Sequence, residues 1–213
     1  MTTRVTNASQ APLEFSDQHV LPEWIDFNGH MNVAYYVMAF DHGVDGLTNY
    51  LDIGPEGIDA RGTSTFTLEM HINYLQELHL GDPIRLTCQL LDYDSKRIHY
   101  FFNMYHATEN YLAATCEQLL LHVNLGERRS SPFPQPVLSK LETLMVLHRQ
   151  LPRPEQAGQP IGILRPGVGV SVYFRRRSAL FETFAKLFYC HNPLCVDAPT
   201  PDSVYFSPCH IIS

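Results

Sequence analysis

Four polar side chains able to take part in chemistry lie close together near the start of the chain, in the stretch EWIDFNGHMNVAYYVMAFDHG at residues 23–43. Asp26, Asn28, His30 and Asn32 alternate around an Asn-Gly step, directly before an apolar run with helical spacing. Backbone amides at a helix start favour negative charge, so they would stabilise an oxyanion on a reacting carbonyl. Asp26, just before that turn, would attack the carbonyl or deprotonate a water that does so.

The same residues have a structural interpretation, which we keep open. An Asn-Gly step is a strong hairpin signal, but a hairpin needs a strand on both sides, and here a helix follows. We therefore expect Asn28-Gly29 to lead a strand into a helix, with Asn28 or Asn32 as its N-cap. Because the chain has no G-x-S-x-G elbow for a serine nucleophile, a carboxylate acting on a reactive carbonyl is our working hypothesis.

The elements that must position these residues are a helix and several strands. Apolar residues with helical spacing predict a helix over 33–51 with one buried face, and Gly43 and Gly46 indicate a close neighbour at its middle. A shorter helix is expected over 137–151. Alternating apolar and polar residues predict strands within 13–24 and over 66–74, 84–90, 98–104 and 114–125, the second with Phe66, Leu68, Met70, Ile72 and Tyr74 on one face.

Turns every 10–15 residues between these strands favour an antiparallel sheet. Such a sheet needs its apolar face covered, and the helix over 33–51 is the long element available to cover it. We therefore predict an α+β fold in which the antiparallel sheet wraps one central helix. The expected organisation is a main domain at 12–130, a helix and linker at 131–160, and a tail of unknown role at 161–213.

The motif resembles the entry to the central helix of the hotdog-fold acyl-CoA thioesterases, the 4-hydroxybenzoyl-CoA thioesterase-like superfamily. Residues Asp26, Asn28, Gly29, His30 and Asn32 match that family's pattern. TLEMHINYLQELHLGDPIRL and AATCEQLLLHVNL resemble its second strand with the following turn and its last strand. The resemblance covers residues 12–160 and extends to the betainyl-CoA thioesterases of carnitine degradation.

The resemblance implies hydrolysis of an acyl-CoA thioester, with betainyl-CoA or another short polar acyl-CoA as substrate. It implies a homodimer or homotetramer with active sites between protomers, and no cofactor beyond the coenzyme A of the substrate. Asp26 would be the nucleophile or general base, and Asn28 and His30 would position substrate or water. Two alternatives stay open: a non-catalytic acyl-CoA-binding module, and an enoyl-CoA hydratase, which the Asp26-x-x-x-His30 spacing disfavours.

Further candidates lie outside the motif. The substrate-binding set that we expect is Trp24, Gly29, Asn32, Tyr35, Tyr36 and Glu117, because aromatic faces suit a quaternary ammonium and a carboxylate inside an apolar strand needs a partner. Glu69, His71 and Asn73 face either solvent or the site, and His122 is expected to face outward. Lys96, Arg97, Arg128 and Arg129 are candidates for the CoA phosphates, against the alternative of ordinary surface charge.

Composition narrows the possible functions. A formal net charge of −7 argues against general nucleic-acid binding. The five cysteines match no common zinc spacing, so we expect no metal, and Cys88 and Cys116 read as small buried side chains. No run of about 18 apolar residues and no apolar leader is visible, which makes the cytoplasm the expected compartment and a membrane partner unexpected.

Overall fold

A computed structural model describes residues 11–56 and 58–163 of the chain. Its strands are β1 (Leu13–His19), β2 (Thr63–Tyr74), β3 (Pro83–Tyr93), β4 (Arg97–His106), β5 (Leu112–Asn124) and β6 (Arg129–Ser130). Its α-helices are α1 (Val33–Tyr50), α2 (Ile58–Arg61) and α3 (Gln135–His148), and a 3-10 turn, η1, spans Pro22–Trp24.

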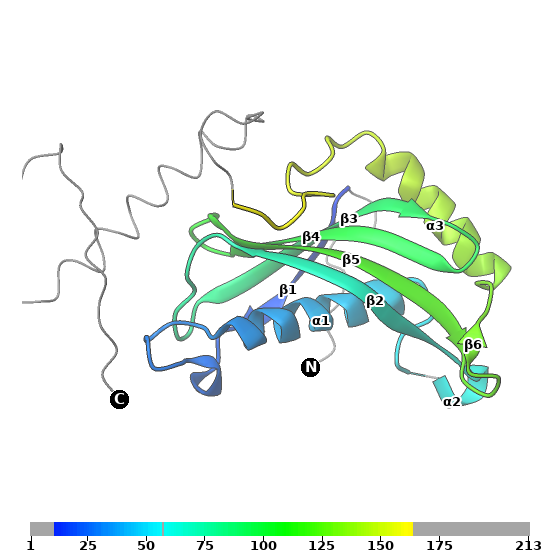
Figure 1. The fold of residues 1–213 in the computed structure, drawn as a ribbon, viewed down its shortest axis with the longest axis horizontal. Helices are drawn as coiled ribbons and strands as arrows, with labels where there is room; N and C mark the ends of the chain where they lie inside the picture. The colour runs from blue at the N-terminus through cyan, green and yellow to red at the C-terminus, as the bar shows by residue number, and fades with distance from the viewer. Residues whose placement is uncertain (1–10, 57, 164–213) are drawn as a thin grey trace, which may run out of the picture. The chain divides into compact units, whose positions relative to one another are not determined.

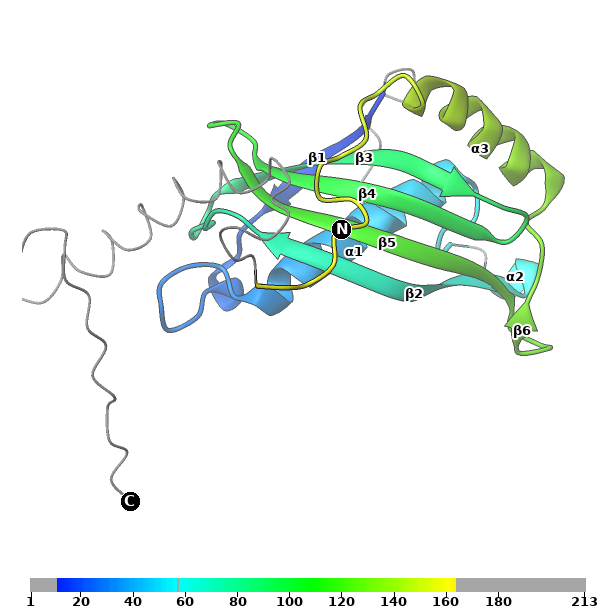
Figure 2. The same cartoon turned by 45° about the horizontal axis from the view of Figure 1, so that its top comes forward.

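The strands form one antiparallel sheet in the order β1-β3-β4-β5-β2, with β6 paired to β5. The sheet curls over α1, while α3 and the segment that follows it lie on the opposite side (Figures 1 and 2). The predicted α+β hotdog architecture, a sheet wrapped around one helix, is therefore confirmed. Because β2 pairs with β5 on one side only, its other edge is free within the described residues.

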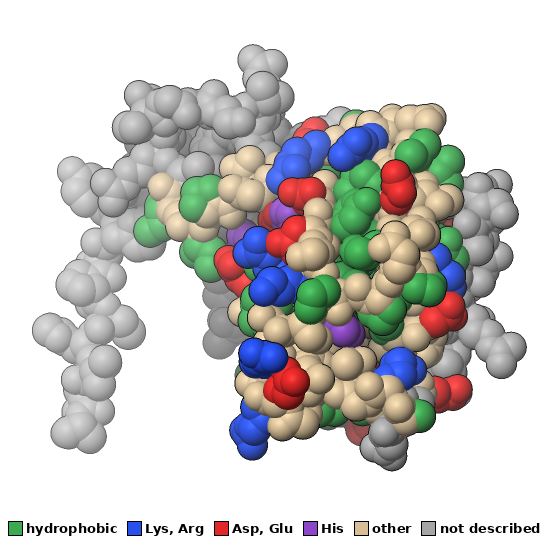
Figure 3. Space-filling view, turned by 90° about the vertical axis from the view of Figure 1, so that its right-hand side faces the viewer, with side chains coloured by type: hydrophobic (Ala, Val, Ile, Leu, Met, Phe, Trp, Pro, Cys, Tyr) green, Lys and Arg blue, Asp and Glu red, His purple; other side chains and the backbone are tan. Residues whose placement is uncertain are grey.

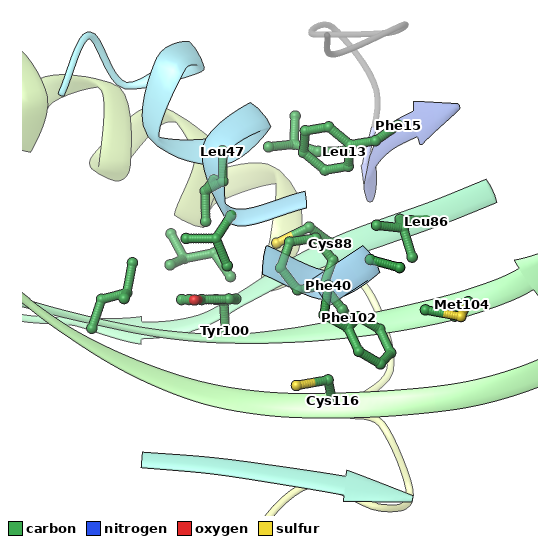
Figure 4. Close-up of a cluster of buried hydrophobic side chains, with 14 of the residues drawn as sticks. Leu13, Phe15, Phe40, Leu47, Leu86, Cys88, Tyr100, Phe102, Met104 and Cys116 are labelled. Atoms are coloured by element: carbon green, nitrogen blue, oxygen red, sulfur yellow. The ribbon is translucent and has the colours of Figure 1, made fainter. Parts of the chain in front are cut away.

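The core lies between α1 and the inner face of the sheet (Figure 4). Gly43 lies where the helix packs closely on the strands: a Cβ there would lie 2.8 Å from Leu86 Cδ1 and 3.1 Å from Phe102 Cε1. The glycine thus costs helix propensity but allows close contact, as its position in the sequence suggested. Cys88 and Cys116 are buried free thiols, as expected.

A β-bulge changes the predicted face of part of β2. Glu69 pairs with Leu119 and Thr67 with Leu120, so Leu68 is the extra residue between them. Since one inserted residue reverses the alternation of side chains, Phe66 lies on the sheet face opposite to Met70. The strict alternation predicted from Phe66 to Tyr74 is therefore wrong before residue 69, and Phe66 is 54% exposed.

Other element boundaries differ modestly from expectation. The first strand ends at His19, because Pro22 opens the 3-10 turn where we expected the strand to continue to Trp24. The short elements α2 and β6 were not predicted. His122, expected to face outward, is buried: its Nδ1 lies 2.9 Å from Ser131 O and its ring packs on Phe133. The expectation that it faces solvent was wrong.

The described residues up to Ile161 belong to one compact unit. The predicted tail, with the cysteines at 190, 195 and 209, falls almost wholly outside the described residues. In the part that the structure does describe, no helix is long and apolar enough to cross a membrane, and no cluster of three or more His, Cys, Asp or Glu is arranged to hold a metal ion.

Candidate functional site

The polar motif forms a tight turn directly before α1. Ile25 and Met31 pair as an isolated antiparallel bridge, and the amide of Asp26 donates to His30 O at 3.1 Å. The amide of Gly29 donates to Asp26 O at 3.0 Å, and Gly29 has a φ of +83°, which suits glycine. The sequence seemed to exclude a hairpin because a helix follows, but a very short one is present: Asp26 and Asn32, the last residue before the helix, are six positions apart.

The Asp26 carboxylate is half-buried and anchored through one oxygen. Its Oδ1 accepts a hydrogen bond from the amide of Asn28 at 2.8 Å. Within the described residues, Oδ2 has no hydrogen-bond partner. The side chains of Phe27 and Asn28 beside it are exposed, Phe27 by 96%. One end of the carboxylate is therefore fixed by the turn, and the other is available to a substrate or water.

Asn32 is the N-cap of α1, one of the two structural roles that we kept open. Its Oδ1 accepts from the amide of Ala34 at 3.0 Å, and its carbonyl accepts from Tyr35 at 3.0 Å. Two of the helix-start amides that we expected to face an oxyanion are therefore occupied. Within the described residues, the amide of Val33 has no recorded partner, so it is the free donor of this first turn.

The aromatic candidates divide into buried and accessible rings. Trp24 is buried and stacks on half-buried Tyr35, with ring centroids 5.5 Å apart and planes 13° from parallel. Tyr36 is buried and meets Tyr74 edge-on at 5.3 Å. Burial raises the pKa of Tyr36, which keeps its hydroxyl protonated. Tyr35 and Tyr74 are thus the rings of these two pairs that keep an accessible surface.

The loop that follows β2 is fastened to the motif, a relationship that sequence reasoning missed. The amide of Met31 donates to Leu78 O at 2.7 Å, and the hydroxyl of Tyr36 accepts from the amide of Leu78 at 3.1 Å. Next to Leu78, Glu77 Oε1 lies 3.9 Å from His30 Nε2. No local pattern marked Glu77, because its contact with His30 joins residues 47 positions apart, as their numbers show.

Glu117 lies away from the motif, on the sheet face opposite to α1. Its Oε1 is 2.7 Å from His99 Nε2, and its Oε2 accepts from the amide of Gly158 at 2.6 Å. These groups line a cavity of about 430 Å³ together with Glu69 and His71, so the polar face of β2 opens here. Among the described residues of the chain, no contact joins Asp26 to Glu117, Glu69 or His71.

The basic candidates gather at two neighbouring turns near the C-terminal end of α1. Lys96 Nζ lies 3.4 Å from Ser130 Oγ, which brings the β3–β4 turn to β6. Arg97 pairs with Asp94, and Arg129 Nε lies 2.6 Å from Glu127 Oε2. The surface at this end shows Lys and Arg interspersed with Asp and Glu (Figure 3). Arg128, exposed with a φ of +52°, belongs to the same turn.

Comparison with known proteins places this geometry in a family. The model of the thioesterase-like superfamily matches residues 20–141, which include the motif turn, α1 and strands β2 to β5. The chain belongs to the thioesterase-like superfamily. The match ends within α3, so the segment that covers the outer face of the sheet lies mostly beyond it.

Relatives within the thioesterase-like superfamily include a betainyl-CoA thioesterase of Pseudomonas aeruginosa, 42% identical over 68% of this chain and 91% of that protein. An L-carnitine dehydrogenase/betainyl-CoA thioesterase of Rhizobium meliloti is 36% identical over 72% of this chain, which spans only 31% of that longer protein. A Staphylococcus aureus protein solved in complex with CoA superimposes with a TM-score of 0.67 at 32% identity, covering 75% of this chain and all of that one.

Proposed function

We propose that the protein hydrolyses a short polar acyl-CoA, with betainyl-CoA as the preferred candidate, and that Asp26 performs the reaction. The observation that carries this proposal is the state of the Asp26 carboxylate: Oδ1 is held by the amide of Asn28, and Oδ2 has no recorded partner in the described residues, beside the start of α1. The identity of 42% to a betainyl-CoA thioesterase, across 91% of that protein, supports the choice of substrate.

Two routes lead from this carboxylate to products. As a general base, Asp26 takes a proton from water, the hydroxide oxygen adds to the thioester carbon, and the C–S bond breaks to release CoA thiolate, which is then protonated. As a nucleophile, Asp26 displaces CoA to form a mixed anhydride, which water hydrolyses. In both routes, we assign the amide of Val33 as the hydrogen-bond donor to the oxyanion. Such a donor stabilises the transition state by about 3 kcal/mol. Asn28 and His30 position substrate or water in this proposal, as predicted from the sequence.

A betainyl group carries a permanent positive charge, which suits accessible aromatic faces. Tyr35 and Tyr74 keep such surface in the folded protomer, and Phe27 is almost fully exposed. Each ring face would contribute about 0.5–2 kcal/mol to binding a quaternary ammonium. Trp24 packs on Tyr35 and Tyr36 packs on Tyr74, so we assign Trp24 and Tyr36 an indirect role in substrate binding.

A second copy of the chain completes this site in our proposal. Apolar side chains are exposed along α1 and at the free edge of β2, among them Val33 at 58%, Leu68 at 53% and Met38 at 41%. Exposed apolar groups beside an open strand edge favour pairing with another chain. We therefore propose a homodimer, with a homotetramer as its extension.

The dimer also accounts for the distance of the basic turns from Asp26. α1 has 18 residues and so is about 27 Å long, with Asp26 before its start and the turns of Lys96 and Arg129 beyond its end. A two-fold partner docked along β2 runs antiparallel, which brings its basic turn towards the Asp26 end of the first protomer. In this arrangement Lys96, Arg97, Arg128 and Arg129 of one copy would serve the CoA phosphates bound by the other.

The cytoplasm is the compartment that we propose for this activity. Cys88 and Cys116 are both free in the structure. Unpaired thiols are the usual state in reducing compartments.

Thiol release from a panel of acyl-CoA substrates that includes betainyl-CoA tests the proposal. We expect turnover by the wild type and a loss on the order of 10² or more in Asp26→Asn, because the amide keeps an oxygen for Asn28 but takes up no proton. A chain that binds acyl-CoA without releasing thiol would be a binding module. Water addition to an enoyl-CoA without thiol release would make it a hydratase.

A single turnover in H₂¹⁸O establishes the nucleophilic role of Asp26 if the label is found in its carboxylate. Direct attack by water places the label in the product acid during the first turnover. A nucleophilic route in which water attacks the aspartyl carbon of the anhydride instead leaves the label in Asp26.

A further inference from the structure

The loop between β2 and β3 holds one carboxylate at a fixed place beside the motif. The hydroxyl of Tyr111 donates to Glu77 O at 2.9 Å. Burial, followed by the charge of Asp82, raises the pKa of Tyr111 to about 12, so this donor stays protonated. On the other side, the amide of Met31 donates to Leu78 O at 2.7 Å. The backbone of Glu77 is therefore held from both directions, and its side chain projects from a defined position.

The Glu77 carboxylate lies between two imidazole rings. Oε1 is 3.9 Å from His30 Nε2, and Oε2 is 3.8 Å from His79 Nε2. The side chains of Glu77 and His30 are 30% and 27% exposed, against 60% for His79, so the contact with His30 is the more enclosed of the two. This geometry gives His30 a defined neighbour on the side away from its backbone.

Both nitrogens of the His30 ring face groups that accept hydrogen bonds. Nε2 lies 3.9 Å from the Glu77 carboxylate, an electrostatic contact that is longer than a hydrogen bond. The other ring nitrogen, Nδ1, lies 3.5 Å from Met31 O, a long and weak contact. Without Glu77, that weak contact alone would orient the ring.

We propose that Glu77 is a positioning residue that sets the orientation of the His30 ring. This inference rests on the proposed function, in which His30 positions substrate or water for Asp26. Glu77 acts through the imidazole and touches no reacting atom. Loss of its charge frees the His30 ring to rotate, which lowers turnover while substrate binding stays intact.

Asp82 supplies a matched control in the same loop. Its Oδ2 lies 3.8 Å from His79 Nδ1 and accepts from the amide of His79 at 2.7 Å, and its Oδ1 lies 3.5 Å from His106 Nε2. Asp82 therefore contacts histidines as Glu77 does, but no contact between Asp82 and His30 is recorded among the described residues. Removing its charge tests for a general effect of acidic groups in this loop.

The first test compares Glu77→Gln with Asp82→Asn. We expect kcat of Glu77→Gln to fall about tenfold with KM unchanged, and Asp82→Asn to retain wild-type kcat. The double variant His30→Asn/Glu77→Gln should lose no more than His30→Asn alone, because the two residues act as one unit. Full additivity of the two losses, or wild-type kcat in Glu77→Gln, would overturn the inference. Thermal unfolding shows whether each variant is folded. If Glu77→Gln does not fold, Glu77→Asp is tested instead. Because Glu77→Asp keeps the charge, it should recover part of kcat.

The second test reads the His30 ring without substrate. The imidazole ¹⁵N chemical shifts of His30 should be the same in the wild type and in Asp82→Asn, and should move in Glu77→Gln, because only that variant removes the charged neighbour of the ring. Identical spectra for wild type and Glu77→Gln would contradict the inference. A wild type that releases no thiol while its ¹⁵N spectra respond to Glu77→Gln would refute the proposed function and leave the pairing of Glu77 with His30 standing.

Discussion

His148 Nδ1 accepts a hydrogen bond of 2.7 Å from the amide of Leu90, and this bond joins α3 to β3. Because the Leu90 amide occupies Nδ1, the ring hydrogen lies on Nε2, which is buried and has no hydrogen-bond partner among the described residues. Burial lowers the pKa of His148 to about 4. The folded protein therefore requires this ring to stay neutral.

This relationship predicts a loss of stability in mild acid. The unfolded chain protonates His148 near pH 6.5, whereas the folded chain does so only near pH 4, so its stabilising contribution is full above pH 6.5 and is lost as the pH falls towards 4. From pH 7 to pH 5, this group should remove about 2 kcal/mol from the free energy of unfolding. His148→Asn keeps an acceptor near Nδ1 and does not titrate. Urea unfolding at both pH values should show a smaller loss in that variant; an equal loss would refute the assignment.

Gly43 should tolerate no larger side chain. Gly43→Val places branched carbons against Leu86 and Phe102, and overpacking there should lower the free energy of unfolding by about 2 kcal/mol. Gly126→Val is the control, because its Cβ would meet only Asn124 Oδ1, at 3.5 Å. Denaturant unfolding measures both, and equal stability of the two variants would contradict the packing.

Asn32 offers a way to separate capping from substrate binding. Asn32→Ala removes the acceptor of the Ala34 amide and should cost about 1 kcal/mol of stability, while Asn32→Asp keeps the cap. If capping is its whole contribution, Asn32→Asp should match the wild type in both stability and KM. A KM that rises in Asn32→Asp at unchanged stability would show a direct contact with substrate.

The exposed face of α1 should govern assembly. Val37→Glu places a charge among the apolar groups exposed on this helix and should shift the chain to a monomer with reduced thiol release, because the partner's basic turn is lost. Val146→Glu on α3 is the matched control, since Val146 is 61% exposed and lies on the other side of the sheet. Light scattering reads the mass of each variant, and an unchanged mass for Val37→Glu would exclude this face.

Glu117 should stabilise the covering segment on the outer face of the sheet. Glu117→Gln weakens its contacts with His99 and Gly158, so limited proteolysis after α3 should become faster. The distance of Glu117 from the motif within one protomer predicts unchanged KM for acyl-CoA. A raised KM with unchanged proteolysis would restore its predicted part in substrate binding.

Most of the architecture could be predicted from the spacing of apolar residues. One helix and several strands, each with one apolar face, can bury these faces in only a few arrangements. The helix at 33–50 and the closely packed Gly43 are examples. The bulge at Leu68 was not readable, since one extra residue leaves the local alternation intact and is revealed only by the pairing partner. The burial of His122 depends likewise on Phe133, which the chain returns to it through β6.

The site was predictable in part. The motif turn and the N-cap follow from local preferences of Asn, Gly and Asp, which act within a few residues. Glu77 was missed because its relation to His30 is created by the return of the chain after β2. The sequence indicated that the Glu117 carboxylate needs a partner. It did not identify His99 and Gly158 as the partners, because periodicity alone does not show whether that face of the sheet meets solvent or the site.

The hydroxyl of Tyr36 ties the first turn of α1 to the loop at Leu78, and Met31 ties the same loop to the motif. These hydrogen bonds therefore hold the helix, the turn and the loop together as one unit. Substitutions that adapt the site to a different acyl group should cost the least stability at Phe27, because its side chain is exposed and does not hold the helix, the turn or the loop in place. Exchanges at that position should diversify substrate preference while the framework beneath it stays intact.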